Sequence, residues 1–134
     1  MHPAYFRCRR PRLQGWRILI VEDEPLVARL LKDEILEAGA GVIGPAGSVE
    51  DALLLIDAAA VDGGLNAAVL DFNLDGAVVL PVADHLAALG VPFLFATGYG
   101  EGCDRGLHTA MPVLAKPFGP HTLLSMLSDL AMRR

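Results

Sequence analysis

The sequence predicts an α/β domain in which five parallel strands form one sheet with helices on both of its faces. Five short apolar runs alternate with amphipathic stretches, an order typical of doubly wound α/β proteins. The first run is rich in β-branched residues, as expected for a strand buried on both faces. At 134 residues the chain fits a single domain, and we expect no second hydrophobic core.

The first half of the chain contains two predicted strand and helix pairs. They are a strand over 17–21, a helix over about 25–38, a weak strand at 42–43 and a helix that follows Ser48 and ends near residue 60. Pro25 suits the first turn of a helix, and Gly39 supplies a stop. Ser48, with Asp51 three residues later, resembles a capping box.

The second half continues the alternation. It predicts a strand over 67–70, a helix over 81–89 and strands over 91–96 and 113–115, followed by a helix over 120–131. The Asp75-Gly76 pair breaks the chain soon after the third strand. Four glycines follow the fourth strand between residues 98 and 106, so a helix there would be short or frayed.

Charge divides the chain into two parts. Residues 1–17 hold five arginines and no acidic residue, whereas the remainder has six basic and sixteen acidic side chains. We therefore expect residues 1–16 to be a disordered extension and residues 17–134 to form the domain. The acidic domain argues against a DNA-binding surface, and no apolar run approaches the roughly 20 residues that span a membrane.

The cysteines and histidines indicate no further site. Cys8 and Cys103 show neither metal-binding spacing nor a disulfide framework, so a cytoplasmic location is the simplest expectation. The four histidines lack the spacing of a metal or catalytic site, and we assign them no functional role.

Polar side chains lie at the ends of four of the five predicted strands. Glu22 and Asp23 follow the first, Asp71 the third, Thr97 the fourth and Lys116 the fifth. Ligands of parallel sheets bind beyond the carboxyl ends of the strands, so these five groups are expected to meet in one pocket.

Three crowded carboxylates repel one another, and a hard divalent cation would remove that cost. Mg²⁺ prefers oxygen ligands and is commonly held by one or two carboxylates together with phosphate oxygens. We assign Asp23, Asp71 and the backbone carbonyl of Asn73 as direct ligands, and Glu22 as a contact through water.

The same pocket fits phosphoryl transfer. Asp71 is the expected nucleophile, because an aspartate carboxylate can accept a phosphoryl group as an acyl phosphate. The hydroxyl of Thr97 and the ammonium of Lys116 would bind the charged phosphoryl oxygens. A cis bond between Lys116 and Pro117 would aim the ammonium inward.

Four segments together resemble the receiver domain of bacterial two-component response regulators over about residues 17–132. They are ILIVEDE, AAVLDFNLDG, FLFATGY and VLAKPF. The resemblance implies a flavodoxin-like (βα)5 fold with strand order 2-1-3-4-5 and a cis bond before Pro117. It also implies that Asp71 accepts phosphate from a sensor histidine kinase or phosphotransfer protein, with Mg²⁺ on Asp23 and Asp71.

The segment PFLFATGY resembles the signature of the single-domain "FAT GUY" receiver subgroup, which is associated with general stress signalling. Val113 stands three residues before Lys116, where most receivers have a switching Tyr or Phe. The usual proline-containing turn after Asn73 is shortened to residues 74–76. We therefore expect the switch to involve Tyr99 and the glycine-rich stretch that surrounds it.

Two alternatives stay open. Haloacid-dehalogenase-type phosphotransferases also use a nucleophilic Asp at a strand end, but they require a second Asp where this chain has Asn73, and they place their acid pair late in the chain. A receiver-like interaction module without phosphorylation would explain the fold alone. With no output domain expected after the last helix, we expect a stand-alone regulator that binds a protein or drains phosphate from a relay, with slow autodephosphorylation rather than enzymatic turnover.

Overall fold

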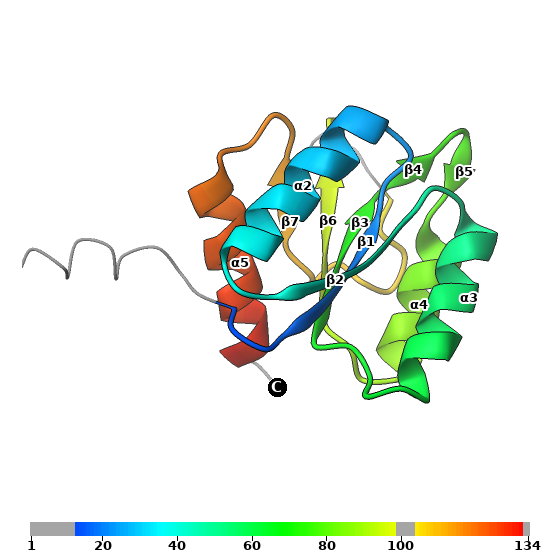
Figure 1. Ribbon diagram of the computed structural model, residues 1–134. Helices are drawn as coiled ribbons and strands as arrows, with labels where there is room; N and C mark the ends of the chain where they lie inside the picture. The colour runs from blue at the N-terminus through cyan, green and yellow to red at the C-terminus, as the bar shows by residue number, and fades with distance from the viewer. Residues whose placement is uncertain (1–12, 99–103, 133–134) are drawn as a thin grey trace, which may run out of the picture.

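The computed structural model describes residues 13–98 and 104–132, and its centre is a five-stranded sheet (Figure 1). The strands are β1 (Arg17–Val21), β2 (Gly41–Ala46), β3 (Ala67–Asp71), β6 (Phe93–Thr97) and β7 (Val113–Ala115). They lie in the order β2-β1-β3-β6-β7, and every neighbouring pair is parallel. This is the 2-1-3-4-5 order of a flavodoxin-like sheet, so the predicted fold class is confirmed.

Helices cover both faces of the sheet (Figure 1). One face carries α2 (Pro25–Glu37) and α5 (Pro120–Met132), and the other carries α3 (Val49–Ala60) and α4 (Leu80–Ala88). Side chains of β1 alternate between the two layers: Ile18 and Ile20 join the α2 and α5 core, whereas Leu19 and Val21 join the α3 and α4 core. Burial on both faces explains the apolar runs of the sequence.

Several predicted boundaries agree closely with the structure, and β2 is the main exception. The hydroxyl of Ser48 accepts a hydrogen bond from the backbone N–H of Asp51 at 3.1 Å, which caps α3 as expected. β2 is longer than the predicted strand at 42–43, and it includes a cis bond between Gly44 and Pro45. Gly44 has φ +98°, and a Cβ there would lie 2.8 Å from the carbonyl oxygen of Ile20. The edge strand therefore requires glycine at this position.

A short hairpin follows β3. It pairs β4 (Asn73–Leu74) with β5 (Ala77–Val78) in antiparallel orientation. Asp75 and Gly76 form the turn with φ values of 50° and 90°, and the side-chain oxygen of Asn73 accepts a hydrogen bond from the N–H of Gly76 at 2.9 Å. The sequence indicates only a chain break here, whereas two successive positive φ values are typical of a tight hairpin turn.

The connection from β6 to β7 contains no helix within the part that the structure describes, residues 104–112. The guanidinium of Arg105 donates to the carbonyl of Met111 at 3.0 Å, and the N–H of Gly106 donates to the carboxylate of Asp104 at 2.9 Å. Residues 99–103 lie outside the described ranges. The short or frayed helix expected from the glycines is therefore not formed at residues 104–112.

Residues 13–16, which the sequence assigns to a disordered extension, pack against the domain. Leu13 is fully buried beside α2 and α5, and its N–H donates to the carbonyl of Ala38 at 2.8 Å. Trp16 packs against the same core. Within the described part, the packed residues thus include Leu13, ahead of residue 17, because this apolar side chain is buried beside α2 and α5. Residues 1–12 lie outside the described part.

Candidate functional site

The carboxyl edge of the sheet brings together the polar residues that end its strands. Glu22 and Asp23 directly follow β1, Asp71 is the last residue of β3, Thr97 is the last of β6 and Lys116 directly follows β7. Asp71 lies opposite Ala96 in the register of β3 and β6, one residue before Thr97. Parallel pairing therefore carries all five groups to the same edge, as the sequence predicts.

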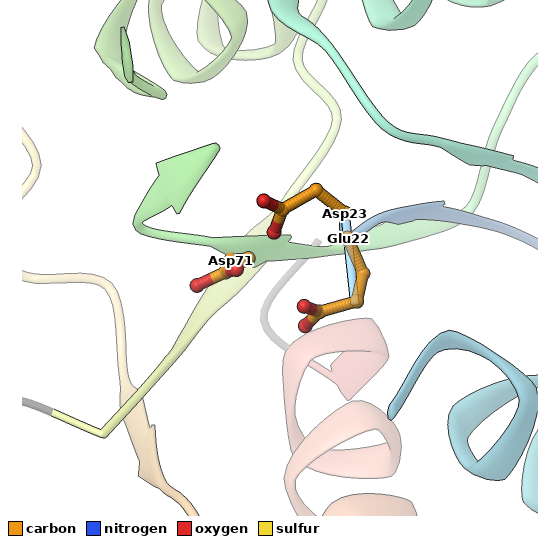
Figure 2. Close-up of side chains that lie close together, drawn as sticks. All are labelled: Glu22, Asp23 and Asp71. Atoms are coloured by element: carbon orange, nitrogen blue, oxygen red, sulfur yellow. The ribbon is translucent and has the colours of Figure 1, made fainter. Parts of the chain in front are cut away.

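Three carboxylates form a compact cluster at this edge. Oxygens of Glu22, Asp23 and Asp71 all lie within 4.8 Å of one another. Figure 2 shows that they come from the ends of two strands, with the side chains of Glu22 and Asp23 leaving the backbone in different directions. Glu22 and Asp71 are buried, with 3% and 9% of their surfaces exposed, so little water screens the repulsion between them.

Lys116 provides the compensating charge. Its Nζ donates to Oε1 of Glu22 at 2.8 Å and lies 3.5 Å from Oδ1 of Asp71. The other oxygen of Glu22 accepts from the backbone N–H of Glu24 at 3.2 Å. Glu22 is thus fixed by two donors, a pairing that the sequence does not indicate because it depends on the directions of two long side chains.

Burial and charge shift the pKa values of two of these groups. The pKa of Asp71 rises from 3.8 to about 7, first because burial disfavours the carboxylate and then because Glu22 is negative, with Lys116 acting in the opposite direction. Burial by itself would lower the pKa of Lys116, but the hydrogen bond and charge of Glu22, together with Asp71, outweigh it and the pKa rises. The site therefore holds a lysine that stays protonated beside an aspartate that loses its proton less readily than usual.

The donor set fits a magnesium ion. Hard carboxylate oxygens from two strand ends converge at this point. A divalent cation would stabilise the ionised form of Asp71, which burial and the charge of Glu22 disfavour. Asp23 and Asp71 line the open hollow, whereas one oxygen of Glu22 is bonded to Lys116. The assignment of Asp23 and Asp71 as direct ligands stays a prediction. The water-mediated contact assigned to Glu22 stays a prediction, as does the carbonyl contact assigned to Asn73.

The remaining predicted residues are placed as follows. Thr97 is buried, with 1% of its surface exposed, at the edge beside Asp71. The bond between Lys116 and Pro117 is cis, the conformation expected from the sequence. Asn73 lies in the hairpin next to the cluster. Tyr99 lies outside the described residues.

A hollow of about 380 Å³ opens above the cluster. Its lining residues are Asp23, Glu24, Asp71, Asn73, Asp75, Gly98 and Lys116. The sequence predicts Asp23, Asp71, Asn73 and Lys116 for this site but gives no role to Glu24 or Asp75. Asp75 reaches the hollow because the β4 and β5 hairpin folds it there, and that hairpin is too short to be predicted from its pattern.

Two other hollows of comparable size lack such chemistry. One of about 330 Å³ is lined mainly by apolar residues and glycines, and the side chain of its Asn66 accepts from the N–H of Arg17 at 2.7 Å. Another of about 310 Å³ lies beside Phe93, His108 and Leu130. Convergent carboxylates and an ammonium favour the hollow at the carboxyl edge as the functional site.

Comparison with known proteins supports this assignment. No protein-family model matches the sequence. The solution structure of SdrG from Sphingomonas melonis Fr1 is 40% identical, with a TM-score of 0.72 over 87% of this chain and 96% of SdrG. The transcriptional regulatory protein TcrA of Mycobacterium tuberculosis is 38% identical over 128 residues, which are 91% of this chain and 48% of TcrA. The chain thus spans about half the length of that curated relative.

A solved structure with bound ligands resembles the chain as well. The response regulator protein TrrA from Thermotoga maritima, in complex with Mg²⁺-BeF, is 26% identical, with a TM-score of 0.71 over 86% of this chain and 98% of TrrA. The sheet order, the acidic cluster and these likenesses define a flavodoxin-like signalling domain of two-component systems. The chain belongs to the response regulator receiver family.

None of the described helices is long and apolar enough to cross a membrane; the longest have 13 residues.

Proposed function

We propose that Asp71 accepts a phosphoryl group from the phosphohistidine of a sensor histidine kinase or a phosphotransfer protein. One observation carries the proposal: Asp71 ends the central strand with two further carboxylates within 4.8 Å and the ammonium of Lys116 at 3.5 Å. A nucleophilic oxygen, a cation site and a positive group thus surround one point. The Mg²⁺-BeF complex of TrrA supports the same use of the site in a relative.

The residues of the chain divide the work of the transfer. An oxygen of Asp71 attacks phosphorus, and Thr97 and Lys116 hold the phosphoryl oxygens. Mg²⁺, when bound by Asp23, Asp71 and the carbonyl of Asn73, supplies positive charge that offsets the incoming group. Lys116 keeps its contact with Glu22 at 2.8 Å, so this buried pair holds the ammonium beside the reacting oxygen.

The finer assignments belong to this proposal. The PFLFATGY segment and the likeness to SdrG favour the "FAT GUY" subgroup and a role in general stress signalling. Output would pass through protein contacts, or the chain would drain phosphate from a relay in the cytoplasm. Tyr99, next to Gly98 at the hollow, is the candidate for the switching side chain.

Phosphotransfer profiling tests the proposal. Phosphorylated sensor kinases and phosphotransfer proteins of the host are each incubated with the chain and Mg²⁺, and phosphate on the chain is followed over time. We expect one or a few donors to label the wild type and none to label Asp71→Asn. Rapid multiple turnover of a small phosphate ester would instead favour a phosphatase, and no labelling by any donor would favour an interaction module.

A further inference from the structure

Two exposed carboxylates stand at the mouth of the hollow, outside the metal cluster. Glu24 approaches from the start of α2, and Asp75 approaches from the turn of the β4 and β5 hairpin. Both side chains are exposed, whereas Glu22 and Asp71 are buried. They line the hollow but are not among the three carboxylates that gather within 4.8 Å.

Within residues 13–98 and 104–132, the lining of this hollow gives Glu24 and Asp75 no basic partner of their own. Among the described residues that line the hollow, Lys116 is the only basic one, and its Nζ is bonded to Glu22 at 2.8 Å. A divalent cation on the cluster would offset Asp23 and Asp71 and leave the charges of Glu24 and Asp75 uncompensated. An incoming phosphoryl donor therefore meets two negative charges before it reaches Asp71.

We propose that Glu24 and Asp75 select the phosphodonor by charge. They slow transfer from small anionic phosphodonors and favour a protein donor that presents cationic side chains beside its phosphohistidine. The inference rests on the proposed function of Asp71 and adds to it the kind of donor that the site admits. Like charges placed at an entrance discriminate between ligands without touching the reacting atoms.

The positions of both carboxylates depend on backbone geometry rather than on their charges. Asp75 has φ 50°, and the turn is closed by the hydrogen bond from Gly76 to Asn73. Asparagine tolerates this left-handed conformation as well as aspartate does, so Asp75→Asn removes the charge and keeps the turn. Glu24 uses its backbone N–H to bind Glu22, and its side chain makes no helix-capping bond, so Glu24→Gln is equally conservative.

The transfer step is the same for every donor. A lone pair on a carboxylate oxygen of Asp71 forms the new O–P bond while the donor's bond to phosphorus breaks. Acetyl phosphate, a dianion near neutral pH, releases acetate with the bonding electrons. Phosphoramidate, which carries its proton on nitrogen and a smaller net negative charge, releases ammonia. The two donors therefore deliver the same group with different charge.

The first experiment measures the rate at which the phosphoryl adduct forms, by intact mass, in excess Mg²⁺ and at increasing ionic strength. For wild type with acetyl phosphate we expect the rate to rise with salt. Glu24→Gln and Asp75→Asn should each be roughly two- to fivefold faster at low salt, the double variant faster still, and the salt dependence flatter. Phosphoramidate should show a smaller effect of the same sign.

Asp62→Asn is the matched control. It removes one carboxylate, 89% exposed, that lies after α3 beside Arg17, at the opposite end of the sheet. Its rates should equal those of wild type. Thermal unfolding of all variants shows whether the fold is kept, and the salt dependence of the wild type gives a reading that needs no variant.

The second experiment tests the chemistry of the partner. Two synthetic phosphohistidine peptides, one flanked by lysines and one by glutamates, are compared as donors. Wild type should prefer the lysine-flanked peptide severalfold, and the double variant should lose most of that preference. If the rate of adduct formation did not change with salt, with the charge of the donor or with either substitution, this inference would be overturned, but Asp71 would remain the acceptor. Failure of the wild type to gain any adduct would overturn both.

Discussion

Two regions at the carboxyl edge of the sheet differ in the forces that act on them. One comprises the ends of β1, β3 and β7, and the other is the connection that follows β6. In the first region, Glu22 and Asp71 are buried and the partly buried Lys116 lies against both, so the charges are close and poorly screened. The second region, over residues 104–112, is irregular, and the guanidinium of Arg105 and the N–H of Gly106 make hydrogen bonds within it.

His108 connects that second region to α4 and to Phe93. Its Nε2 lies 2.6 Å from Oδ1 of Asp84 on α4, and its ring packs edge-on against Phe93 with centroids 5.2 Å apart. The sequence gives this histidine no role, yet only 10% of its side chain is exposed. We therefore expect a substitution in the connection to remove only the contacts of that one side chain. A substitution in the charged cluster should change the interactions of the remaining charges as well.

The difference shows where the fold concentrates unfavourable energy. The cluster keeps three carboxylates together and is relieved by a ligand of the right charge, while the β6 to β7 connection contributes ordinary stabilising contacts. Substitutions in the two regions should thus differ in size and even in sign.

The largest expected effect comes from breaking the buried ion pair. Lys116→Met keeps most of the side-chain volume but leaves Glu22, whose side chain is fully buried, without its 2.8 Å partner. We expect a loss of about 2–4 kcal/mol in the free energy of unfolding by urea. The double variant Glu22→Gln, Lys116→Met should recover part of this loss, and a single-variant loss below about 0.5 kcal/mol would contradict the pairing.

The opposite sign is expected for Asp71→Asn in the absence of Mg²⁺. The pKa of Asp71 is raised from 3.8 to about 7, so its contribution to stability is full below about pH 4 and is lost as the pH rises to about 7. At pH 8 the variant should therefore be more stable than wild type by about 1–3 kcal/mol. If the difference in stability between Asp71→Asn and wild type were the same at pH 5 and pH 8, repulsion at Asp71 would not destabilise the fold.

The affinity for Mg²⁺ should depend on the ionisation of Asp71. Binding displaces a proton from Asp71, so affinity should increase up to tenfold per pH unit below about 7 and level off above it. Calorimetric titration from pH 5.5 to pH 8.5 measures this directly. Asp23→Ala should weaken Mg²⁺ binding far more than Glu22→Gln does. A Mg²⁺ affinity that does not change with pH would show that binding displaces no proton from Asp71.

The smallest effects belong to the second region. His108→Ala removes an aromatic contact and a bond to Asp84 made by a histidine that is only 10% exposed, although Asp84 itself is 64% exposed. It should cost about 1–2 kcal/mol of stability without changing Mg²⁺ affinity. His85→Ala is the matched control, because its bond to Asp57 at 2.8 Å is more exposed and should be worth less than about 1 kcal/mol. Equal losses would mean that burial does not distinguish the two pairs.

The strands and the edge that they share could be predicted because buried parallel strands leave a strong local pattern. Apolar runs that end in Asp23, Asp71 and Thr97 determine both the sheet and the position of the site. The helix faces follow less directly from the sequence. The spacing of apolar residues places Leu30 of α2 and Leu89, at the end of α4, on inward faces, yet 48% and 47% of their surfaces are exposed. The buried faces instead combine an alanine with larger side chains: α2 buries Ala28, Leu31 and Ile35, and α4 buries Val82, Ala83 and Leu86.

What the sequence does not predict depends on side-chain direction and on tight turns. The pairing of Lys116 with Glu22 joins residues 94 positions apart, and no local pattern reports it. Asp75 reaches the hollow only through a two-residue turn with positive φ values. The packing of Leu13 depends on a site beneath α2 that forms only once the helix is in place.

The most direct measurement of the central claim is intact-mass analysis after incubation with phosphoramidate and Mg²⁺. The account predicts one labile phosphoryl adduct on wild type, located on Asp71, strongly reduced when Mg²⁺ is chelated and absent from Asp71→Asn. An equally labile adduct on Asp71→Asn would contradict it.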